Sequence, residues 1–573
     1  MDEKPWLAWY GDAPLSLDYP SLSLYETVMR TVRRAPDAPA LDFFGYRATY
    51  RELGAAIDRG AGALSALGLA AGDRITISLP TCPQAVIAVY AAVKLGAVPC
   101  MIHPLSTPPE IERYLNLSGS RFAVTLDALY APLAEAAAGT RLETLVLTRI
   151  SDPLPAWQRP FLRLRGGRVP RVPRDPRVRR WAELMAGEQP GSGPVPVDAD
   201  GLALVLYSGG TTGEPKAIML SHRNVVAEAM EITAWTKLGQ RDVVLVPLPI
   251  FHGFCLGALV HAPLMAGARL LLMPRFSAKR AARLIRSARP TLLAGVPTLF
   301  EALVREPRVR KADLSCLRAA FSGADTLQPM LKERFDRLVA ERGGHAQLLE
   351  GYGLTEAVTA IMATPLSAYR EGTIGVPLPD VLAKICRPGT DEALAPGSEG
   401  EICICGPSVM LGYLDDPEAT AATLRRHGDD RTWLHTGDLG RMDGDGFFYL
   451  GGRLARMIKS SGFNVYPAQV EAVLGEHPAV AQACVVGLPD ELQGERVKAF
   501  VMLAPGRHGS PELAEELIAH CRSRLIRWSC PRELEFRPGL PLTRFGKVDY
   551  IALVREERLA ASTSAGTSSG RSR

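Results

Sequence analysis

Amphipathic and apolar stretches alternate along the first part of the chain, and this alternation limits the folds that are open to it. Residues 49–68 place apolar side chains at helical spacing, residues 74–80 read as a strand, and residues 83–102 read as a helix followed by a strand. The alternation resumes after the apolar run 202–207 and continues to about residue 400. Helices that alternate with strands in this way are typical of α/β domains.

The later part of the chain has a different pattern. A stretch richer in strands follows residue 400, and Asp416 and Pro417 read as the N-cap and first residue of a short helix within it. Short α and β segments then run from about residue 453 to residue 558, and the Ser-rich composition of residues 561–573 predicts a disordered tail. The sequence therefore predicts an α/β and α+β protein with more than one domain.

The composition narrows the class of protein. A chain of 573 residues is too long for one hydrophobic core, and its 47% hydrophobic and 22% charged residues are typical of a soluble globular protein. The net charge of +5 is weak for this length and argues against nucleic acid as a partner. Ten cysteines without a CxxC pair are expected to be reduced core thiols, with Cys403 and Cys405 spaced as on a strand. Together with an N-terminus that lacks the pattern of a secretory signal, they predict a cytoplasmic protein.

One long segment raises the question of a membrane span. Residues 243–268 contain no Asp, Glu, Lys or Arg. Three prolines and two histidines lie within them, and both residue types are unfavourable in a membrane helix. We therefore expect a buried core segment.

A glycine-rich segment, "YSGGTTGEPK" at residues 207–216, directly follows the apolar run 202–207. The run predicts a buried strand, so the glycines lie at a strand's carboxyl end, where α/β proteins commonly bind ligands. Backbone amides, hydroxyl groups and the Lys216 ammonium would together suit phosphate. The spacing differs from that of a Walker A loop, and a plain turn between two strands remains the alternative.

Residues 151–200 interrupt the alternation with prolines, glycines and arginines. Between Trp157 and Trp181, only Asp175 opposes a run of nine arginines: Arg159, Arg163, Arg165, Arg168, Arg171, Arg174, Arg177, Arg179 and Arg180. Such a cluster would suit peripheral contact with anionic lipid headgroups, with Trp157, Phe161 and Leu162 as interfacial anchors. The alternative is a solvated basic linker, which the prolines favour because they prevent one continuous amphipathic helix.

Seven segments resemble, in order and approximate spacing, the motifs of the adenylate-forming superfamily of acyl-CoA synthetases, luciferases and peptide-synthetase adenylation domains. They are "YSGGTTGEPKAIMLSH" (207–222), "PLPIFHGF" (247–254), "FSGAD" (321–325), "EGYGLTEA" (350–357), "WLHTGDLGRMDGDGFFYLGGR" (433–453), "KSSGFNVYPAQVE" (459–471) and "LPLTRFGKVDY" (540–550). Within this superfamily the chain most resembles bacterial long-chain fatty acid–CoA ligases. The basic linker, the "SGFNVYP" form and the apolar segment beside His252 carry that closer resemblance.

The resemblance implies a domain organisation. A large N-terminal AMP-binding domain, residues 1–452, is expected to contain two α/β sheets and a β-rich subdomain, and a small mobile α+β domain, residues 453–560, follows it. Members of the superfamily rotate the small domain about a hinge just after the position of Arg453. Here Ala455 stands at the hinge position that usually carries Asp or Lys, and Arg456 stands where an acidic residue is common. Hinge residues need only absorb a change of backbone angles, so rotation can persist with these residues. The rate of the second half-reaction is in question, whereas adenylation is expected to be intact.

The resemblance also assigns residues to ATP. Members join a carboxylate to AMP, release pyrophosphate and pass the acyl group to the thiol of CoA. The residues implied to hold the β- and γ-phosphates are Ser208, Gly209, Gly210, Thr211, Thr212, Gly213 and Lys216. Thr355 and Glu356 match the α-phosphate and Mg²⁺ positions, and a carboxylate is a suitable hard ligand for this ion. Taken alone, "LTEA" would also fit a helix-capping element.

The nucleoside has its own set of implied contacts. Gly323, Ala324 and Tyr352 match the residues that form the adenine slot. Asp438 offers two acceptor oxygens to the ribose hydroxyl groups, and Arg453 matches a further ribose contact. An aspartate in "TGD" would equally fix a turn.

The reacting groups complete the implied site. His252 matches an aromatic position beside the bound carboxyl group, although a lone histidine in an apolar run is commonly a core residue. Lys547 matches the catalytic lysine of the mobile domain, whose ammonium bridges the carboxylate and α-phosphate oxygens. After rotation, Ser461 and Gly462 would contact the pantetheine of CoA.

The expected function is ATP-dependent conversion of a carboxylic acid, a medium- to long-chain fatty acid, into its CoA thioester. ATP, Mg²⁺ and CoA are the expected cofactors and co-substrates, and the apolar segment beside His252 would form a wall of the acyl tunnel. One alternative is an acyl-AMP ligase that hands the acyl group to a carrier protein. Another is a catalytically silent lipid or nucleotide sensor, which would be expected to have lost some of the site residues. The sequence does not indicate an oligomeric state.

Overall fold

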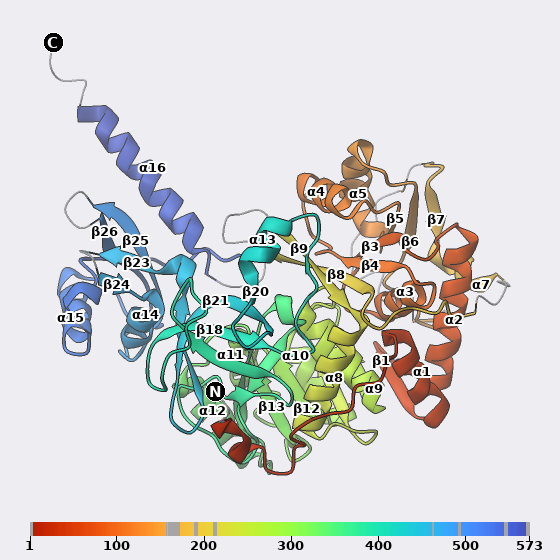
Figure 1. Ribbon diagram of the computed structural model, residues 1–573, viewed down its shortest axis with the longest axis horizontal. Helices are drawn as coiled ribbons and strands as arrows, with labels where there is room; N and C mark the ends of the chain where they lie inside the picture. Colours follow the sequence, from red (N-terminus) through yellow and green to blue (C-terminus); the bar gives the residue numbers. More distant parts are fainter. Residues whose placement is uncertain are drawn as a thin grey trace. The chain divides into compact units, whose positions relative to one another are not determined.

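The computed structural model describes residues 4–155, 157–158, 172, 174–187, 193–209, 215–460, 463–490, 494–525, 527–543 and 548–568. Figure 1 follows the chain from red at the N-terminus to blue at the C-terminus. The chain forms two compact units: Met1–Ala383 with Ile404–Leu434 and Asp445–Phe447, and Lys384–Cys403 with His435–Gly444 and Phe448–Arg573. The predicted domain boundary after residue 452 stays a prediction, because the second unit includes two segments that precede it.

A nine-stranded sheet forms one layer of the first unit. Its strand order is β16-β15-β14-β13-β12-β10-β11-β1-β2. The strands from β14 to β1 run parallel, and β15, β16 and β2 pair antiparallel at the two edges. The strands are β1 (Pro39–Phe43), β2 (Tyr46–Thr49), β10 (Val243–Val246), β11 (Arg269–Leu272), β12 (Leu292–Gly295), β13 (Ala319–Ser322), β14 (Leu348–Gly353), β15 (Ala360–Ala363) and β16 (Val376–Pro377).

An eight-stranded sheet forms a second layer of the same unit, in the order β19-β9-β8-β4-β3-β5-β6-β7. The strands from β8 to β7 run parallel, whereas β9 and β19 pair antiparallel. The strands are β3 (Arg74–Ser78), β4 (Val98–Met101), β5 (Phe122–Leu126), β6 (Thr144–Thr148), β7 (Val178–Arg180), β8 (Leu202–Gly209), β9 (Pro215–Ser221) and β19 (Gly412–Tyr413).

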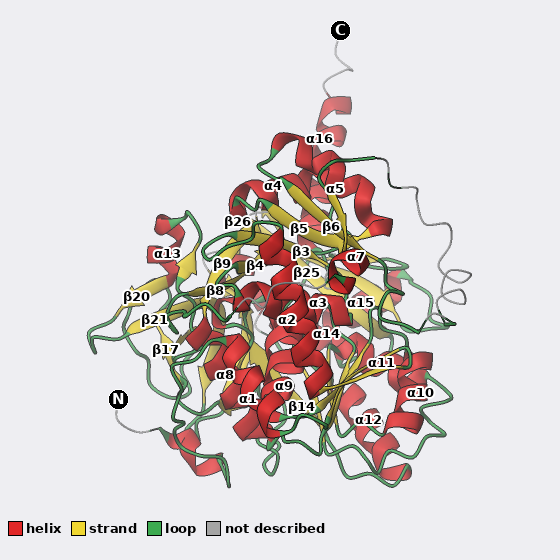
Figure 2. Cartoon of the chain, turned by 90° about the vertical axis from the view of Figure 1, so that its right-hand side faces the viewer, coloured by secondary structure: helices red, strands yellow, loops and turns green. Residues whose placement is uncertain are grey.

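A layer of helices lies between these two sheets. Helices α2 and α9 contact strands of the nine-stranded sheet, α3 contacts strands of the eight-stranded sheet, and α8 contacts both, while α1 packs on all four helices (Figure 2). Their bounds are α1 (Leu24–Arg34), α2 (Tyr50–Ala66), α3 (Pro83–Lys94), α8 (His222–Thr236) and α9 (Ala262–Ala266). The helix predicted at 49–68 is thus confirmed, and Thr49 and Glu52 cap its start reciprocally.

The remaining helices of the first unit flank the sheets or lie in connections. They are α4 (Pro108–Ser118), α5 (Tyr130–Ala136), α7 (Trp181–Ala186), α10 (Ala278–Ala288), α11 (Pro297–Arg305), α12 (Pro329–Glu341) and α13 (Pro417–Thr423). Asp416 caps α13 by accepting a hydrogen bond from the N–H of Ala419 at 2.9 Å, with Pro417 at the first helical position, as the sequence predicts.

The β-rich part of the chain forms a five-stranded sheet in the order β17-β18-β21-β20, with β22 paired to β21. Its strands are β17 (Leu382–Cys386), β18 (Gly400–Cys405), β20 (Leu424–Arg426), β21 (Thr432–Met442) and β22 (Phe448–Arg453). Cys403 and Cys405 lie on β18, so the expected strand spacing is confirmed. All ten cysteines are free, and eight of them are buried.

The C-terminal segment builds a second five-stranded sheet, ordered β24-β23-β26-β25 with β27 parallel to β26. Its elements are β23 (Ile458–Ser460), β24 (Phe463–Val465), α14 (Pro467–Gly475), β25 (Val480–Asp490), β26 (Gly494–Leu503), α15 (Pro511–Arg522), β27 (Glu533–Phe536) and α16 (Tyr550–Ser568). Helix α16 continues into the segment 561–573, for which the composition predicts a disordered tail, and its Ala and Ser residues permit a helix. The α/β and α+β fold class itself is confirmed.

Residues 243–268 are part of the first unit's core. They form β10, the π-helix η4 (Phe254–His261) and α9, and the core side chains among them include Leu256, Leu259 and Val260. In the described part of the chain, no helix has both the length and the apolar character needed to cross a membrane. The expectation of a buried core segment is therefore confirmed.

Two carboxyl groups of α8 are fully buried. Glu228 Oε1 accepts a hydrogen bond from the N–H of Ala360 at 3.0 Å, and Glu231 Oε1 accepts one from the Tyr19 hydroxyl at 3.5 Å. The Oε2 atom of each has no hydrogen-bond partner among the described residues. Burial raises the pKa of both carboxyl groups well above the usual value, and the charges of Glu228 and Asp380 raise that of Glu231 further.

We expect the double variant Glu228→Gln/Glu231→Gln to unfold at a higher temperature than the wild-type chain, and more so at pH 8 than at pH 5. A carboxyl group whose pKa is raised on folding stabilises the fold below its unfolded pKa and loses that contribution as the pH rises toward its folded pKa. The loss is about 1.4 kcal/mol per pH unit for each group. Calorimetry at the two pH values should show the gap in Tm widen by at least about 2 °C.

Glu341→Gln, at the exposed end of α12, is the matched control and should give no such gap. An equal Tm difference at both pH values would show that the two groups of α8 do not titrate in the folded chain as their burial requires.

Candidate active site

The glycine-rich segment connects two paired strands. Strand β8 is buried at positions 203–206, as predicted, and it pairs antiparallel with β9 so that Ser208 lies opposite Lys216. The segment begins at a strand's carboxyl end, as expected of a phosphate-binding loop. It also joins two neighbouring strands, as expected of a plain turn, so the topology agrees with both interpretations. Four predicted phosphate-binding residues lie outside the described residues: Gly210, Thr211, Thr212 and Gly213.

Lys216 and Glu356 meet on the same tyrosine. The Lys216 ammonium lies 4.5 Å from the centre of the Tyr413 ring, which is a cation–π contact. The Tyr413 hydroxyl donates a hydrogen bond to Glu356 Oε1 at 3.0 Å. Burial raises the pKa of Tyr413, and the neighbouring Glu356 charge raises it further, so the phenol keeps the proton that it donates. The structure thus brings together two predicted site residues that are far apart in the sequence.

Tyr413 itself was not among the residues predicted from the sequence. It lies on β19, which pairs antiparallel with β9 and places Tyr413 opposite Ile218, two residues after Lys216. The signal available in the sequence was an aromatic residue after a glycine in the β-rich stretch. That signal does not reveal which strand β19 pairs with.

A tight backbone turn holds Glu356 in place. Thr355–Ala357 form a 3₁₀ turn whose N-cap is Leu354 without a side-chain cap, so the capping interpretation of "LTEA" is not supported. Val358 follows with φ 62° and ψ −67°, and the N–H of Thr359 donates to the carbonyl of Ala357 at 2.7 Å. A β-branched residue in this γ-turn conformation is strained.

Two glycines make room for this turn. A Cβ atom at Gly253 would lie 1.9 Å from the carbonyl oxygen of Val358, and one at Gly353 would lie 1.4 Å from the carbonyl oxygen of Thr359. Neither position can hold a side chain without a shift of the backbone. Because Gly253 directly follows His252, this packing brings His252 to the segment that carries Thr355 and Glu356.

The predicted adenine residues lie at the carboxyl ends of the parallel strands β13 and β14. A Cβ atom at Gly323 would lie 3.0 Å from the carbonyl oxygen of Gly351 and 3.4 Å from the Phe254 ring. Ala324 adopts φ 69°, in the left-handed region, and Tyr352 is buried. The backbones of β13 and β14 thus approach each other closely beside an aromatic ring, as a flat slot for a purine requires.

His252 is half-buried and its side chain caps a helix. Its Nδ1 accepts a hydrogen bond from the N–H of Phe254 at 3.1 Å, and its carbonyl accepts from the N–H groups of Cys255 and Leu256. An Nδ1 atom that accepts carries no proton, so the neutral ring carries its proton on Nε2. The core-residue alternative explains this contact.

Asp438 and Arg453 belong to the second unit. They are opposite each other on β21 and β22, and Arg453 Nε lies 2.9 Å from Asp438 Oδ1. The Asp438 side chain is buried and the Arg453 side chain is about half exposed. Asp438 therefore lies within a strand, which argues against the interpretation of "TGD" as a turn.

Three predicted residues of the C-terminal segment, Ser461, Gly462 and Lys547, lie outside the described residues. Of the two unusual hinge residues, Ala455 lies in the short turn η6 (Leu454–Arg456). Arg456 forms an ion pair with Glu471 and donates to the carbonyl of Val485 at 3.2 Å. This arginine is thus anchored to the C-terminal sheet and to α14.

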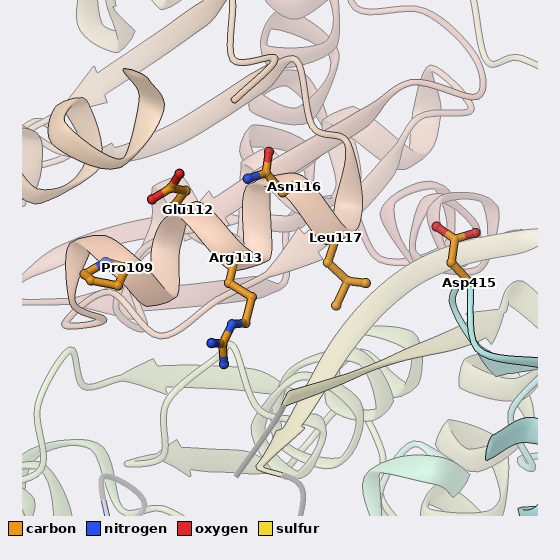
Figure 3. A pocket seen from close by; sticks show the side chains of 6 residues that line it. All are labelled: Pro109, Glu112, Arg113, Asn116, Leu117 and Asp415. Atoms are coloured by element: carbon orange, nitrogen blue, oxygen red, sulfur yellow. The ribbon is translucent and has the colours of Figure 1, made fainter. Parts of the chain in front are cut away.

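A separate surface pocket of about 550 Å³ lies between helix α4 and Asp415, which comes shortly after β19 in the sequence (Figure 3). The side chains that line it are Pro109, Glu112, Arg113, Asn116, Leu117 and Asp415. Its lining includes none of the predicted site residues that the structure describes, and it mixes one cation with two carboxylates. Nothing in this lining matches the chemistry predicted for the site.

Comparison with known sequences finds two matching family models along the chain. The AMP-binding enzyme family matches residues 28–414, and the AMP-binding enzyme C-terminal domain matches residues 469–547. The chain is 35% identical over 566 residues to a long-chain-fatty-acid–CoA ligase of Bacillus subtilis, covering 97% of this chain and 99% of that protein. It is 34% identical over 554 residues to 4-coumarate–CoA ligase 2 of Oryza sativa, covering 93% and 92% of the two chains.

Solved structures share the fold. The crystal structure of an ATP-bound RpMatB–BxBclM chimera has a TM-score of 0.81 and 28% identity, and covers 94% of this chain and 99% of its own. A benzoate CoA ligase from Burkholderia xenovorans has a TM-score of 0.80 and 26% identity, and covers 93% of this chain and 100% of its own. The family match extends over more than half of the chain and includes the residues that meet around Tyr413. The chain therefore belongs to the AMP-binding enzymes of the adenylate-forming superfamily.

Proposed function

We propose that this chain is an ATP-dependent acid–CoA ligase that activates a medium- to long-chain fatty acid. The acid would first form acyl-AMP with release of pyrophosphate, and the thiol of CoA would then displace AMP. The observation that carries the proposal is that Lys216 lies over the Tyr413 ring while the Tyr413 hydroxyl donates to Glu356. The relative named long-chain-fatty-acid–CoA ligase, which matches almost end to end, supports the choice of acid and acceptor.

Glu356 offers a fitting ligand for Mg²⁺. Its Oε1 is oriented by the Tyr413 hydroxyl, and carboxylate oxygen is what this ion prefers. When bound, Mg²⁺ neutralises charge on the phosphate oxygens and orients them. Lys216 supplies a second, fixed positive charge for the phosphates that leave, together with the hydroxyl group of Ser208 opposite it on the paired strand.

The acid would be held by two donors. The ring of His252 would donate to a carboxylate oxygen. The ammonium of Lys547 would reach the same carboxylate and an α-phosphate oxygen, and would offset their repulsion as the C–O–P bond forms. The apolar residues of η4 that follow His252 are proposed as one wall of the acyl tunnel.

Contact with anionic lipid through residues 157–181, at the cytoplasmic face of a membrane, is part of the proposal. Trp157 has 69% of its surface exposed, which suits an interfacial anchor. Trp181 is buried at the start of α7 and is not available for such contact. Phe161 and Leu162 lie outside the described residues.

The acceptor distinguishes this proposal from an acyl-AMP ligase that serves a carrier protein. With ATP, Mg²⁺, palmitate and CoA, we expect purified protein to form palmitoyl-CoA, AMP and pyrophosphate in equal amounts, measured by chromatography. Accumulation of palmitoyl-AMP without thioester would favour the carrier-protein alternative, and the absence of pyrophosphate release with every acid from acetate to oleate would favour the silent sensor. The same panel, scored by pyrophosphate release, would define the preferred chain length.

Lys547→Ala is expected to lower pyrophosphate release at least about 100-fold, because a preorganised charge at the reacting oxygens is lost. Binding of ATP, measured by calorimetry, should change by less than about twofold, since the lysine acts on the α-phosphate only as the acid attacks. Lys311→Ala, an exposed lysine of the first unit, is the control. Unchanged pyrophosphate release by the Lys547 variant would contradict its role.

Tyr413→Phe is expected to lower kcat/KM for MgATP at least about tenfold and to raise the Mg²⁺ concentration needed for half-maximal rate. The change removes the hydrogen bond to Glu356, worth roughly 1.5–3 kcal/mol for a charged acceptor, and keeps the ring under Lys216. Tyr369→Phe is the control, because the ring of Tyr369 also lies beside a lysine, with Lys332 4.1 Å from its centre. A loss of rate without a shift in the Mg²⁺ requirement would argue against a role of Tyr413 in orienting Glu356.

A further inference from the structure

Three potential metal ligands meet in the interior of the second unit, apart from the residues assigned to ATP. Glu401 and Cys403 are two residues apart on β18 and so lie on one face, and His435 lies on the neighbouring strand β21. All three are buried, and their ligand atoms lie within 4.8 Å of one another. This combination of carboxylate, thiol and imidazole is the donor set of zinc sites.

The distances are close to those of a tetrahedral site. His435 Nδ1 lies 3.5 Å from Cys403 Sγ and 2.8 Å from Glu401 Oε2. Zinc bonds of about 2.0–2.1 Å to nitrogen or oxygen and about 2.3 Å to sulfur place neighbouring N and S ligands about 3.6 Å apart and N and O ligands about 3.3 Å apart. The distance from His435 Nδ1 to Cys403 Sγ fits without change, and the distance from Nδ1 to Glu401 Oε2 would have to increase by roughly half an ångström.

A hydrogen bond between His435 and Glu401 explains only part of this arrangement. Nδ1 carries at most one proton, yet it faces both a carboxylate oxygen and a sulfur atom. A cation between the three atoms would satisfy all of them at once. The other oxygen of Glu401 accepts a hydrogen bond from the N–H of Gly437 at 3.0 Å, which fixes the carboxylate in the way that outer contacts fix metal ligands.

A further thiol lies on the neighbouring strand. Cys386, the last residue of β17, is buried beside β18, but its thiol is not part of the group whose ligand atoms all lie within 4.8 Å of one another. The protein therefore supplies three ligands. One thiolate and one carboxylate together carry a charge of about −2, which a divalent ion would neutralise.

We propose that Glu401, Cys403 and His435 bind one structural Zn²⁺ that ties β18 and β21 together. The ligand set excludes Mg²⁺, which prefers oxygen alone. The site is closed to solvent, as structural zinc sites are. Three residues after His435 on β21 lies Asp438, so the ion would hold the strand that carries this residue.

The test uses the full-length chain with reduced thiols. After incubation with Zn²⁺ and gel filtration, we expect about one equivalent of retained zinc by mass spectrometry, and a higher Tm than for the chelator-treated protein. Co²⁺ in place of zinc should give a thiolate-to-metal absorption band. Cys403→Ser should weaken zinc affinity at least about tenfold in competition with a chelating dye and should lose the band.

Cys521→Ser is the matched control, because Cys521 is a buried thiol of the same unit that lies outside this group, and it should retain zinc as the wild-type chain does. If Cys403→Ser fails to fold, Glu401→Gln takes its place and should show the same loss of affinity. A wild-type chain that retains no zinc, or equal retention by the wild-type chain and by the ligand variant, overturns the proposal. A loss of zinc by Cys521→Ser alone would overturn it equally.

Discussion

The backbone of residues 355–359 is the constraint on which the first unit's site depends. A γ-turn at a β-branched residue costs about 1–3 kcal/mol, and it persists only where the surroundings leave no other path. Here Gly253 and Gly353 have no side chain, so the carbonyl oxygens of Val358 and Thr359 can lie where a Cβ atom would otherwise be. One consequence is that three separate parts of the chain, at His252, at β14 and at Glu356, are fixed against one another without a ligand.

The second consequence concerns charge. Lys216 and Glu356 are opposite charges that do not form an ion pair in the contacts described above; each interacts with a different part of Tyr413, one with the ring face and one with the hydroxyl. A direct ion pair would have to be broken before either group could bind phosphate or a metal ion. A neutral side chain that contacts both groups keeps them oriented, which is the preorganisation that electrostatic catalysis requires.

Much of the fold and of the candidate site could be predicted from the sequence, and the features that could not be predicted share one cause. Local spacing predicted α2, β3, α3 and β8, because these elements depend on neighbours in the sequence. The ordered motifs predicted the residues that converge near Glu356. Tyr413 was missed because its importance comes from the pairing of β19 with a distant strand. The burial of Glu228 and Glu231 was missed for the same reason, since nothing local to α8 shows that η4, α9 and strands of both sheets pack around it.

The composition of the second unit has a consequence for synthesis on the ribosome. Its segments 384–403 and 435–444 are translated before the chain from Phe448 onward, which supplies most of their unit. A nascent chain that has just passed residue 444 contains every strand of the two large sheets, and of the five-stranded sheet to which these segments contribute it lacks only β22. The order of translation thus favours early folding of the first unit, and it leaves the second to form from both old and new chain at the end.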